Sequence, residues 1–207
     1  MKAVYYAGVV FLSLNLGACS FGPVEEAHSN TYMLTDISMQ IPVAHPQAAT
    51  LMVMPVTAVR GFDSTAMRYQ MRPYQLSSFA QNMWMAPPAN MISPLLLKSL
   101  QNSHLFQAVV SGPSMNNTTY TLNAKLLALY QDFTVKPSQM VLSLELSFGN
   151  NQNNQLVADQ VMTVRVNTAA ETPYAGVQAA NQALSQSLGY VTQFVSLALM
   201  QSAGSAL

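Results

Sequence analysis

The stretch MVLSLELSF, Met140–Phe148, alternates apolar and polar side chains over most of its length. Because successive side chains of a β-strand point to opposite faces, every second residue from Met140 onward lies on one apolar face. Ser143, Glu145 and Ser147 lie on the other face. This pattern predicts a strand with one buried and one exposed face, in a sheet that is covered on one side.

Two further runs with the same period flank this strand. Upstream, every second residue from Tyr120 to Tyr130 is apolar or small, and these residues are predicted to share one face. Downstream, Leu156–Val166 alternates less strictly, with Met162, Val164 and Val166 predicted to point inward. The polar segment Gly149–Asn154 is typical of a solvated hairpin turn. The second half of the chain therefore predicts three antiparallel strands.

The first half predicts four shorter strands. Thr50–Val56 is typical of a strand buried on both faces, and Ala66–Arg72 alternates with Met67, Tyr69 and Met71 on one side. Gly61-Phe62-Asp63 lies between them and predicts a hairpin turn. Two more extended segments are expected, at Gln75–Phe79 and Leu105–Ser111.

Two helices complete the expected fold. The first begins at Pro87-Pro88, or at Ser93 followed by Pro94, and ends near Ser103; the sequence leaves both starts open. The second begins at Pro173 and carries an apolar stripe at helical spacing. Its members are Val177, Ala180, Leu184, Leu188, Val191, Val195 and Ala198. The fold class expected is α+β, an antiparallel sheet with two helices packed on one face.

The N-terminus has the pattern of a secretory signal peptide. Lys2 precedes a mostly apolar run, Ala3–Leu16, which is too short for a membrane-spanning helix of about 20 residues. The run ends in Leu16-Gly17-Ala18-Cys19, which resembles the bacterial lipobox. Cleavage before Cys19 would leave its thiol and new amine for acylation, and stable anchoring needs more than one chain.

These features divide the chain into four expected parts. They are a signal peptide over residues 1–18, a lipidated tether over 19–30, one α+β domain over 31–201, and a flexible tail over 202–207. Ser20 follows the cysteine, and the sorting rule known for enteric bacteria then favours the periplasmic face of the outer membrane.

Composition limits the possible partners and chemistry. The chain has 8 basic and 8 acidic residues, so no basic field is present to attract nucleic acid. No Gly-x-Ser-x-Gly elbow, phosphate-binding glycine loop or metal-ligand spacing occurs, and the three histidines are scattered. The sequence therefore predicts a non-catalytic protein without a metal or other cofactor.

A series of short motifs resembles a known family. The motifs are Tyr32-Met33-Leu34, Leu51–Val56, Met67-Arg68-Tyr69, Gln75-Leu76, Phe79–Trp84, Pro87-Pro88, Leu95-Leu96, Leu100 and Leu105–Val109. In this order, behind a lipobox, they resemble the ABC-type transport auxiliary lipoproteins, the PqiC-like family. The resemblance implies an envelope protein that works with an inner-membrane ABC transporter and an MCE-domain protein. It also implies that the cargo is lipid or another hydrophobic compound, and it is compatible with a homo-oligomer.

Two side chains are candidate contacts for a partner or a lipid. Trp84 can be an exposed apolar anchor, although a core tryptophan beside Pro87-Pro88 is the favoured interpretation. Arg68 can bind a carboxylate or phosphate, or simply be solvated. The alternative function is an assembly or pilotin-type lipoprotein for secretion or lipopolysaccharide export, and an envelope enzyme is a third hypothesis.

Overall fold

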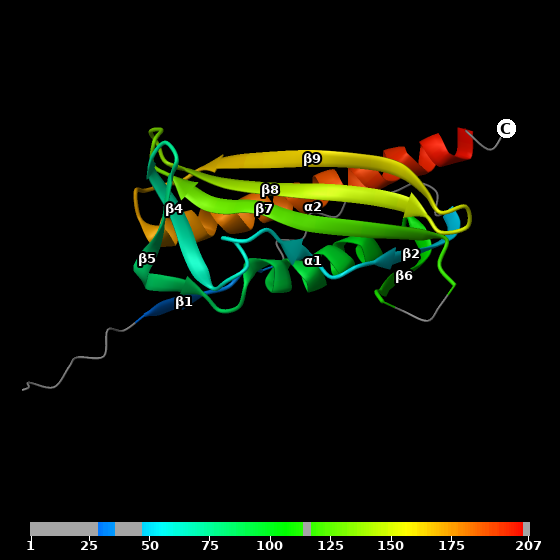
Figure 1. The fold of residues 1–207 in the computed structure, drawn as a ribbon, viewed down its shortest axis with the longest axis horizontal. Coiled ribbons are helices and arrows are strands. Elements are labelled where there is room, and N and C mark those ends of the chain that lie inside the picture. The colour runs from blue at the N-terminus through cyan, green and yellow to red at the C-terminus, as the bar shows by residue number, and fades with distance from the viewer. Residues whose placement is uncertain (1–28, 36–46, 114–116, 205–207) are drawn as a thin grey trace, which may run out of the picture.

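The computed structural model describes residues 29–35, 47–113 and 117–204. They form a long mixed sheet with two helices on one of its faces (Figure 1). The strands are β1 Asn30–Tyr32, β2 Gln47–Val53, β3 Thr57–Ala58, β4 Ala66–Arg72, β5 Gln75–Trp84, β6 Phe106–Ser111, β7 Tyr120–Asp132, β8 Gln139–Asn150 and β9 Gln155–Asn167. The helices are α1 Pro88–Asn102 and α2 Pro173–Gly204. The α+β class with two helices is confirmed.

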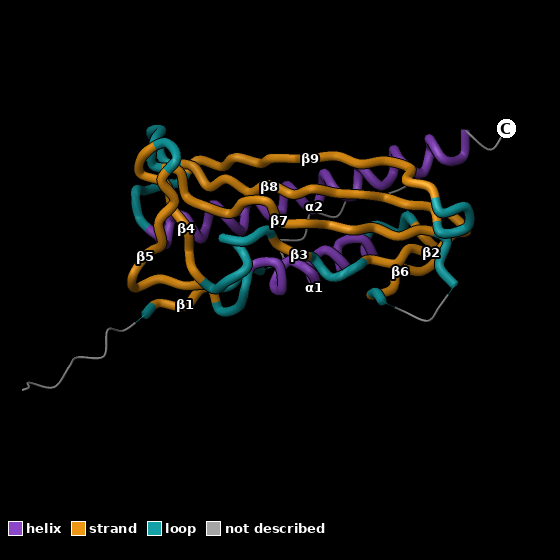
Figure 2. The backbone as a smooth tube through the Cα atoms, in the orientation of Figure 1, coloured by secondary structure: helices purple, strands orange, loops and turns teal. Residues whose placement is uncertain are grey.

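Strand β7 organises the sheet. Along one side it pairs with β8, and β8 pairs with β9, all antiparallel as the alternating runs predict. Along its other side β7 pairs in turn with β2, β3 and β4, and all three of these pairings are parallel. The sheet is therefore mixed, which corrects the expectation of a purely antiparallel one. Figure 2 shows how the short strands flank the long β7–β9 meander.

The expected hairpin around Gly61-Phe62-Asp63 is wrong. The strand that was predicted before this segment, β2, lies between β6 and β7, and the two-residue β3 that follows it also pairs with β7. Strand β4 pairs with β5 and β7. The hairpin that forms instead joins β4 to β5. Its second strand, Gln75–Trp84, is longer than the expected Gln75–Phe79 because it also pairs with β1.

A β-bulge changes which residues of β7 face the core. Leu126 lies opposite Leu144 of β8, but Ala128 already lies opposite Ser143, so one residue is inserted between them. Such an insertion reverses the face for every later residue. Ala128 and Tyr130 therefore leave the core face, which corrects their expected position, and Leu129 takes their place there with 2% exposure.

Helix α1 resolves the choice of start in favour of Pro87. Pro87 is the N-cap, and its carbonyl accepts a hydrogen bond from the Asn90 N–H at 2.9 Å. Pro94 lies inside the helix. Ser93 instead links the helix to the strand region, because its Oγ accepts from the Val56 N–H at 2.8 Å and donates to the Ala89 carbonyl at 2.9 Å.

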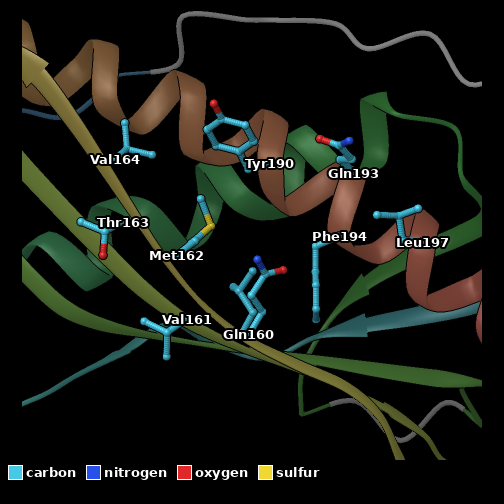
Figure 3. Close-up of a pocket in the computed structure, with 10 residues that line it drawn as sticks. Gln160, Val161, Met162, Thr163, Val164, Tyr190, Gln193, Phe194 and Leu197 are labelled. Atoms are coloured by element: carbon cyan, nitrogen blue, oxygen red, sulfur yellow. The ribbon is translucent and has the colours of Figure 1, made fainter.

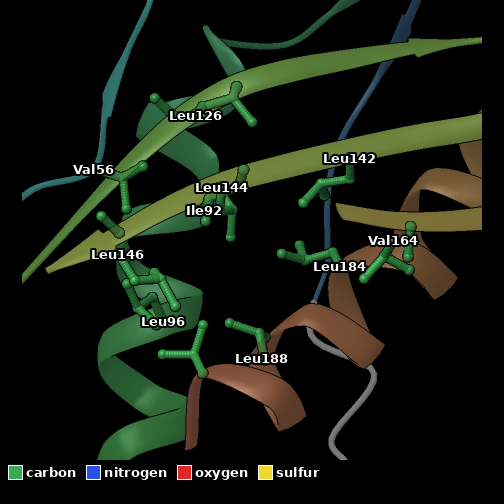
Figure 4. Packing of buried hydrophobic residues seen from close by; sticks show 14 of the residues in the cluster. Val56, Ile92, Leu96, Leu126, Leu142, Leu144, Leu146, Val164, Leu184 and Leu188 are labelled. Carbon is green, nitrogen blue, oxygen red and sulfur yellow. The ribbon is translucent and has the colours of Figure 1, made fainter. Parts of the chain in front are cut away.

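The core lies between the sheet and the two helices. Every member of the predicted stripe on α2 is buried, and Leu184, Val191 and Val195 have no exposed surface. Figure 4 shows side chains from both helices pointing toward those of β7 and β8. Helix α2 continues to Gly204, beyond Ser202, where the tail was expected to begin.

Candidate interaction site

The lipidation site and most of the tether lie outside the described residues, which begin at Ser29. Cys19 as the acylated residue therefore stays a prediction. The chain enters the domain through β1, which runs parallel to β5 with Tyr32 opposite Trp84. Figure 1 shows β1 and the β4–β5 hairpin at one end of the molecule and the β8–β9 turn at the other.

Trp84 lies in the core. Its side chain is 2% exposed, and the backbone around it is held on both sides. The Trp84 N–H donates to the Thr65 carbonyl at 2.8 Å, and the Met85 N–H donates to the Tyr32 carbonyl at 2.7 Å. The indole has no surface to offer a partner, which corrects its selection as a candidate contact and agrees with the favoured interpretation as a core tryptophan.

Arg68 of β4 forms two hydrogen bonds, one within the hairpin and one to the loop before it. Its Nε donates to the Gly61 carbonyl at 2.9 Å and its Nη1 donates to Ser78 Oγ at 2.6 Å. The guanidinium thus joins the loop before β4 to β5, the second strand of the hairpin. These two bonds assign Arg68 a structural part, and binding of a carboxylate or phosphate by it stays a prediction.

The turn of the β4–β5 hairpin presents apolar side chains that the sequence analysis did not select. We call Met71–Leu76 the hairpin tip. Tyr74 is fully exposed, and Met71 and Leu76 are 59% and 42% exposed. Met71 was expected to share one side of its strand with Met67, which is buried, but the β4–β5 pairing shifts register between Gln70 and Arg72, and Met71 is exposed.

An aromatic cluster supports the hairpin tip from behind. The ring of Tyr69 on β4 lies 4.5 Å from that of Phe79 on β5, and Phe133 lies within 6.4 Å of both. Offset and edge-to-face ring pairs of this kind stabilise by about 0.5–1.5 kcal/mol each. The Phe133 N–H also donates to the Gln70 carbonyl at 2.9 Å, which fixes the hairpin to the end of β7.

A second surface lies between β9 and α2. We call it the edge groove, and it has a volume of about 510 Å³. Figure 3 shows its two walls, residues 160–164 of β9 and residues 190–197 of α2. Val161, Tyr190 and Leu197 are each at least half exposed. They lie off the apolar stripe of α2 and on the outer face of β9, so core periodicity could not identify them.

One titratable group near the outer face of the sheet is perturbed. The pKa of Tyr130 is raised above 10.0, first because burial disfavours the charged phenolate. The carboxylate of Asp132 raises it further, whereas the guanidinium of Arg165 acts in the opposite direction. Tyr130 reached this position through the bulge in β7, and its ring lies 6.4 Å from that of Phe62.

The described parts of the chain contain no obvious metal centre or membrane span. Across residues 29–35, 47–113 and 117–204, no three His, Cys, Asp or Glu side chains gather closely enough to hold a metal ion. Within the same ranges, no helix is both long and apolar enough to cross a membrane.

The long meander, the parallel flanking strands and the two helices define a class of small α+β domains, here preceded by a lipobox-like sequence. The chain belongs to the family described as ABC-type transport auxiliary lipoprotein component, whose model matches residues 32–189. The resemblance noted in the sequence is thereby confirmed. Membership makes the protein a lipoprotein component that works with an ABC-type transport system.

Two solved structures share the fold. A crystal structure of a protein from Xanthomonas campestris is 18% identical, with a TM-score of 0.77, and the match covers 85% of this chain and 99% of that one. A second crystal structure, of an uncharacterized protein, is 15% identical with a TM-score of 0.65, and covers 82% and 99%. No curated protein matches the chain. At these identities the likeness concerns the fold alone.

Proposed function

We propose that this protein is a non-catalytic auxiliary subunit of an MCE-type ABC transport system, anchored in the outer membrane by lipid on Cys19. The system would move lipid or another hydrophobic compound between the two membranes. The observation that carries the proposal is the family match over residues 32–189, which begins shortly after a lipobox-like sequence. The roles of the MCE protein, the lipid cargo and the outer membrane rest on the family resemblance.

The physical mechanism is attachment followed by docking. Ser29 is ten positions after Cys19 in the sequence, and an extended chain of that length reaches about 35 Å. The acyl chains hold the protein at the membrane, and the tether lets the domain approach a partner at that distance. Docking then depends on a surface that is apolar, exposed and rigidly held.

The hairpin tip meets these three requirements. Met71, Tyr74 and Leu76 are exposed, and the aromatic cluster beneath them holds the two strands together. Tyrosine and methionine are enriched at protein interfaces relative to the rest of the protein surface. We therefore assign the hairpin tip as the surface that docks on the periplasmic part of the transport system.

Photo-crosslinking from the hairpin tip tests this proposal. A crosslinking amino acid replaces Tyr74 in the full-length lipoprotein in its own envelope, and a matched variant carries it at Gln152 in the β8–β9 turn at the other end. Capture of an MCE-domain protein or ABC transporter subunit from position 74, and not from 152, supports the proposal. Capture of secretion or lipopolysaccharide-assembly proteins instead would establish the alternative function. Capture of lipid alone at position 74 would contradict docking through the hairpin tip.

A further inference from the structure

Strand β9 forms a long open edge of the sheet. It has 13 residues and pairs with β8 on one side, while no other strand in the described part of the chain pairs with its outer side. Natural edge strands are commonly short, or protected by lysine or proline. Gln155–Asn167 contains neither residue and includes Val157, Val161, Met162 and Val164. An edge of this kind favours pairing with another strand.

The backbone of β9 has a defined orientation at this edge. The Ser143 hydroxyl of β8 donates to the Met162 carbonyl at 3.1 Å, so the carbonyl of Met162 points toward β8. Backbone polar groups alternate between the two sides of an antiparallel strand. The N–H and C=O groups of Val161 and Thr163 therefore point to the open edge, as do those of Asp159 and Arg165.

Two opposite charges lie symmetrically along this edge. Asp159 is three residues before Met162 and Arg165 is three residues after it, and both are exposed on the outer face. The ion pair of the neighbouring strands is Lys125–Glu145, and among the described residues neither Asp159 nor Arg165 takes part in one. Neither charge is thus neutralised by an ion pair within the described residues, although Arg165 also acts on Tyr130 of β7 across the outer face of the sheet.

We propose that β9 pairs antiparallel with β9 of a second copy of this chain, about a twofold axis at Met162. In this register Asp159 lies directly opposite the second copy's Arg165, and the symmetry forms the pair twice. Opposite charges directly across an antiparallel pair are stabilising, and like charges there are destabilising. A twofold axis centred at any other residue would not place these two side chains opposite each other.

The alternation of the backbone permits this register. Residues 159, 161, 163 and 165 all direct their polar groups outward, and the twofold axis at Met162 places 161 opposite 163 and 159 opposite 165. Each outward residue thus meets another outward residue, as hydrogen-bonded antiparallel pairs require. The two nine-stranded sheets would join into one continuous sheet.

Exposed apolar surface lies on both sides of this edge. Val161 is 59% exposed on the outer face, where the second copy's Thr163 would lie beside it. On the helix side, Tyr190 and Leu197 are 53% and 50% exposed along the edge groove. A second copy of β9, continuing the sheet, would cover this groove. The formal net charge of zero gives two copies little overall repulsion.

A cysteine at the twofold axis tests the arrangement. In this register Met162 meets its own copy in a non-hydrogen-bonded pair, with Cα atoms about 4.5 Å apart, a separation that a disulfide can bridge. Gln160 is on the same face of β9, but it lies opposite Val164, so the two copies of Gln160 are about 14 Å apart along the strand. That distance exceeds the limit of roughly 7 Å for a disulfide.

The experiment uses the full-length lipoprotein in oxidised membranes. Met162→Cys should form a disulfide-linked dimer on a non-reducing gel. Gln160→Cys and the unmodified chain, whose single cysteine is Cys19, should not. Equal crosslinking at 160 and 162, or none at 162, would overturn the proposed register. The readout needs no transport partner, so its failure is distinct from failure of the proposed function.

Charge exchange supplies a second test that does not alter the core. Asp159→Arg and Arg165→Asp each place like charges opposite each other twice, and each should weaken self-association at least about tenfold by analytical ultracentrifugation. The double variant exchanges the two charges and should restore association. The proposal would be refuted if the single variants associate as well as the parent, or if the double variant associates no better than the single variants. It would also be refuted if the parent protein is monomeric at every concentration tested.

Discussion

Gly176 of α2 lies directly against the side-chain amide of Gln131 in β7, where a methyl group on Gly176 would overlap the Gln131 Oε1 atom. Gln131 is completely buried, and its Nε2 donates to Ser138 Oγ at 3.0 Å and to the Thr172 carbonyl at 3.4 Å. Ser138 in turn shares a 2.6 Å hydrogen bond with Thr168 Oγ1. This polar cluster fixes the start of α2 to the end of the meander.

Gly176→Ala should therefore destabilise the domain despite the better helix propensity of alanine. Propensity favours alanine by roughly 1 kcal/mol, whereas overpacking against a hydrogen-bonded buried amide costs about 1–3 kcal/mol, so we expect a net loss of up to about 2 kcal/mol. Urea unfolding followed by circular dichroism measures it. Gln178→Ala, on an exposed position of the same helix, is the matched control and should be neutral or stabilising. A Gly176→Ala variant more stable than the parent would show that Gln131 moves aside freely.

Trp84→Ala should reduce the free energy of unfolding by about 3–5 kcal/mol, the usual cost of truncating a buried aromatic side chain. Tyr74→Ala removes an aromatic ring that is fully exposed, and surface changes usually alter stability by less than about 0.5 kcal/mol. Chemical denaturation of both variants compares the two sites. Because Trp84 is the single tryptophan, its fluorescence also reports its burial and should shift to longer wavelength on unfolding. A small effect of Trp84→Ala would contradict its place in the core.

The raised pKa of Tyr130 predicts a loss of stability in alkali. The folded state holds the phenol proton more tightly than the unfolded state, so this contribution is fully present below pH 10.0 and is lost as the pH rises through the folded pKa. Subtracting the tyrosinate absorbance titration of Tyr130→Phe from that of the parent isolates this group. Its midpoint should lie above 10.0. A midpoint at or below that value would show that the Arg165 charge outweighs burial and Asp132.

Cys19→Ser should release the protein from the membrane and leave its domain folded. The thiol is the expected attachment point for lipid, whereas the described domain starts at residue 29 and does not include it. Membrane fractionation gives the first readout and thermal unfolding of the released protein gives the second. A variant that stays with the membranes and supports transport unchanged would disprove the anchor-centred mechanism.

The sequence predicted well those elements that depend on local periodicity. The alternation from Met140 to Phe148 and the stripe on α2 each identified side chains that are buried, because a strand of period 2 and a helix of period 3.6 expose one face to the core. The prolines Pro87-Pro88 and Pro173 also marked where the two helices begin. These features need no knowledge of the partner segment.

The errors concern features that depend on distant segments. Nothing in the sequence of β2 says that its neighbours are β6 and β7, because parallel pairing needs no turn signal. Likewise, the bulge before Ala128 is visible only as a shift in the pairing with β8. Tyr74 illustrates the same limit: it is a large aromatic residue, and only its place at the turn of the folded hairpin shows that it is exposed.

The sequence by itself therefore determined the lipobox-like motif, the β-strand and helix periods and the family, since each is encoded by neighbouring residues. Only the tertiary structure decided the direction of the strands, the exposed hairpin tip and the open edge of β9. These depend on which segments meet across the sheet, and that choice is set by how the whole apolar surface is buried.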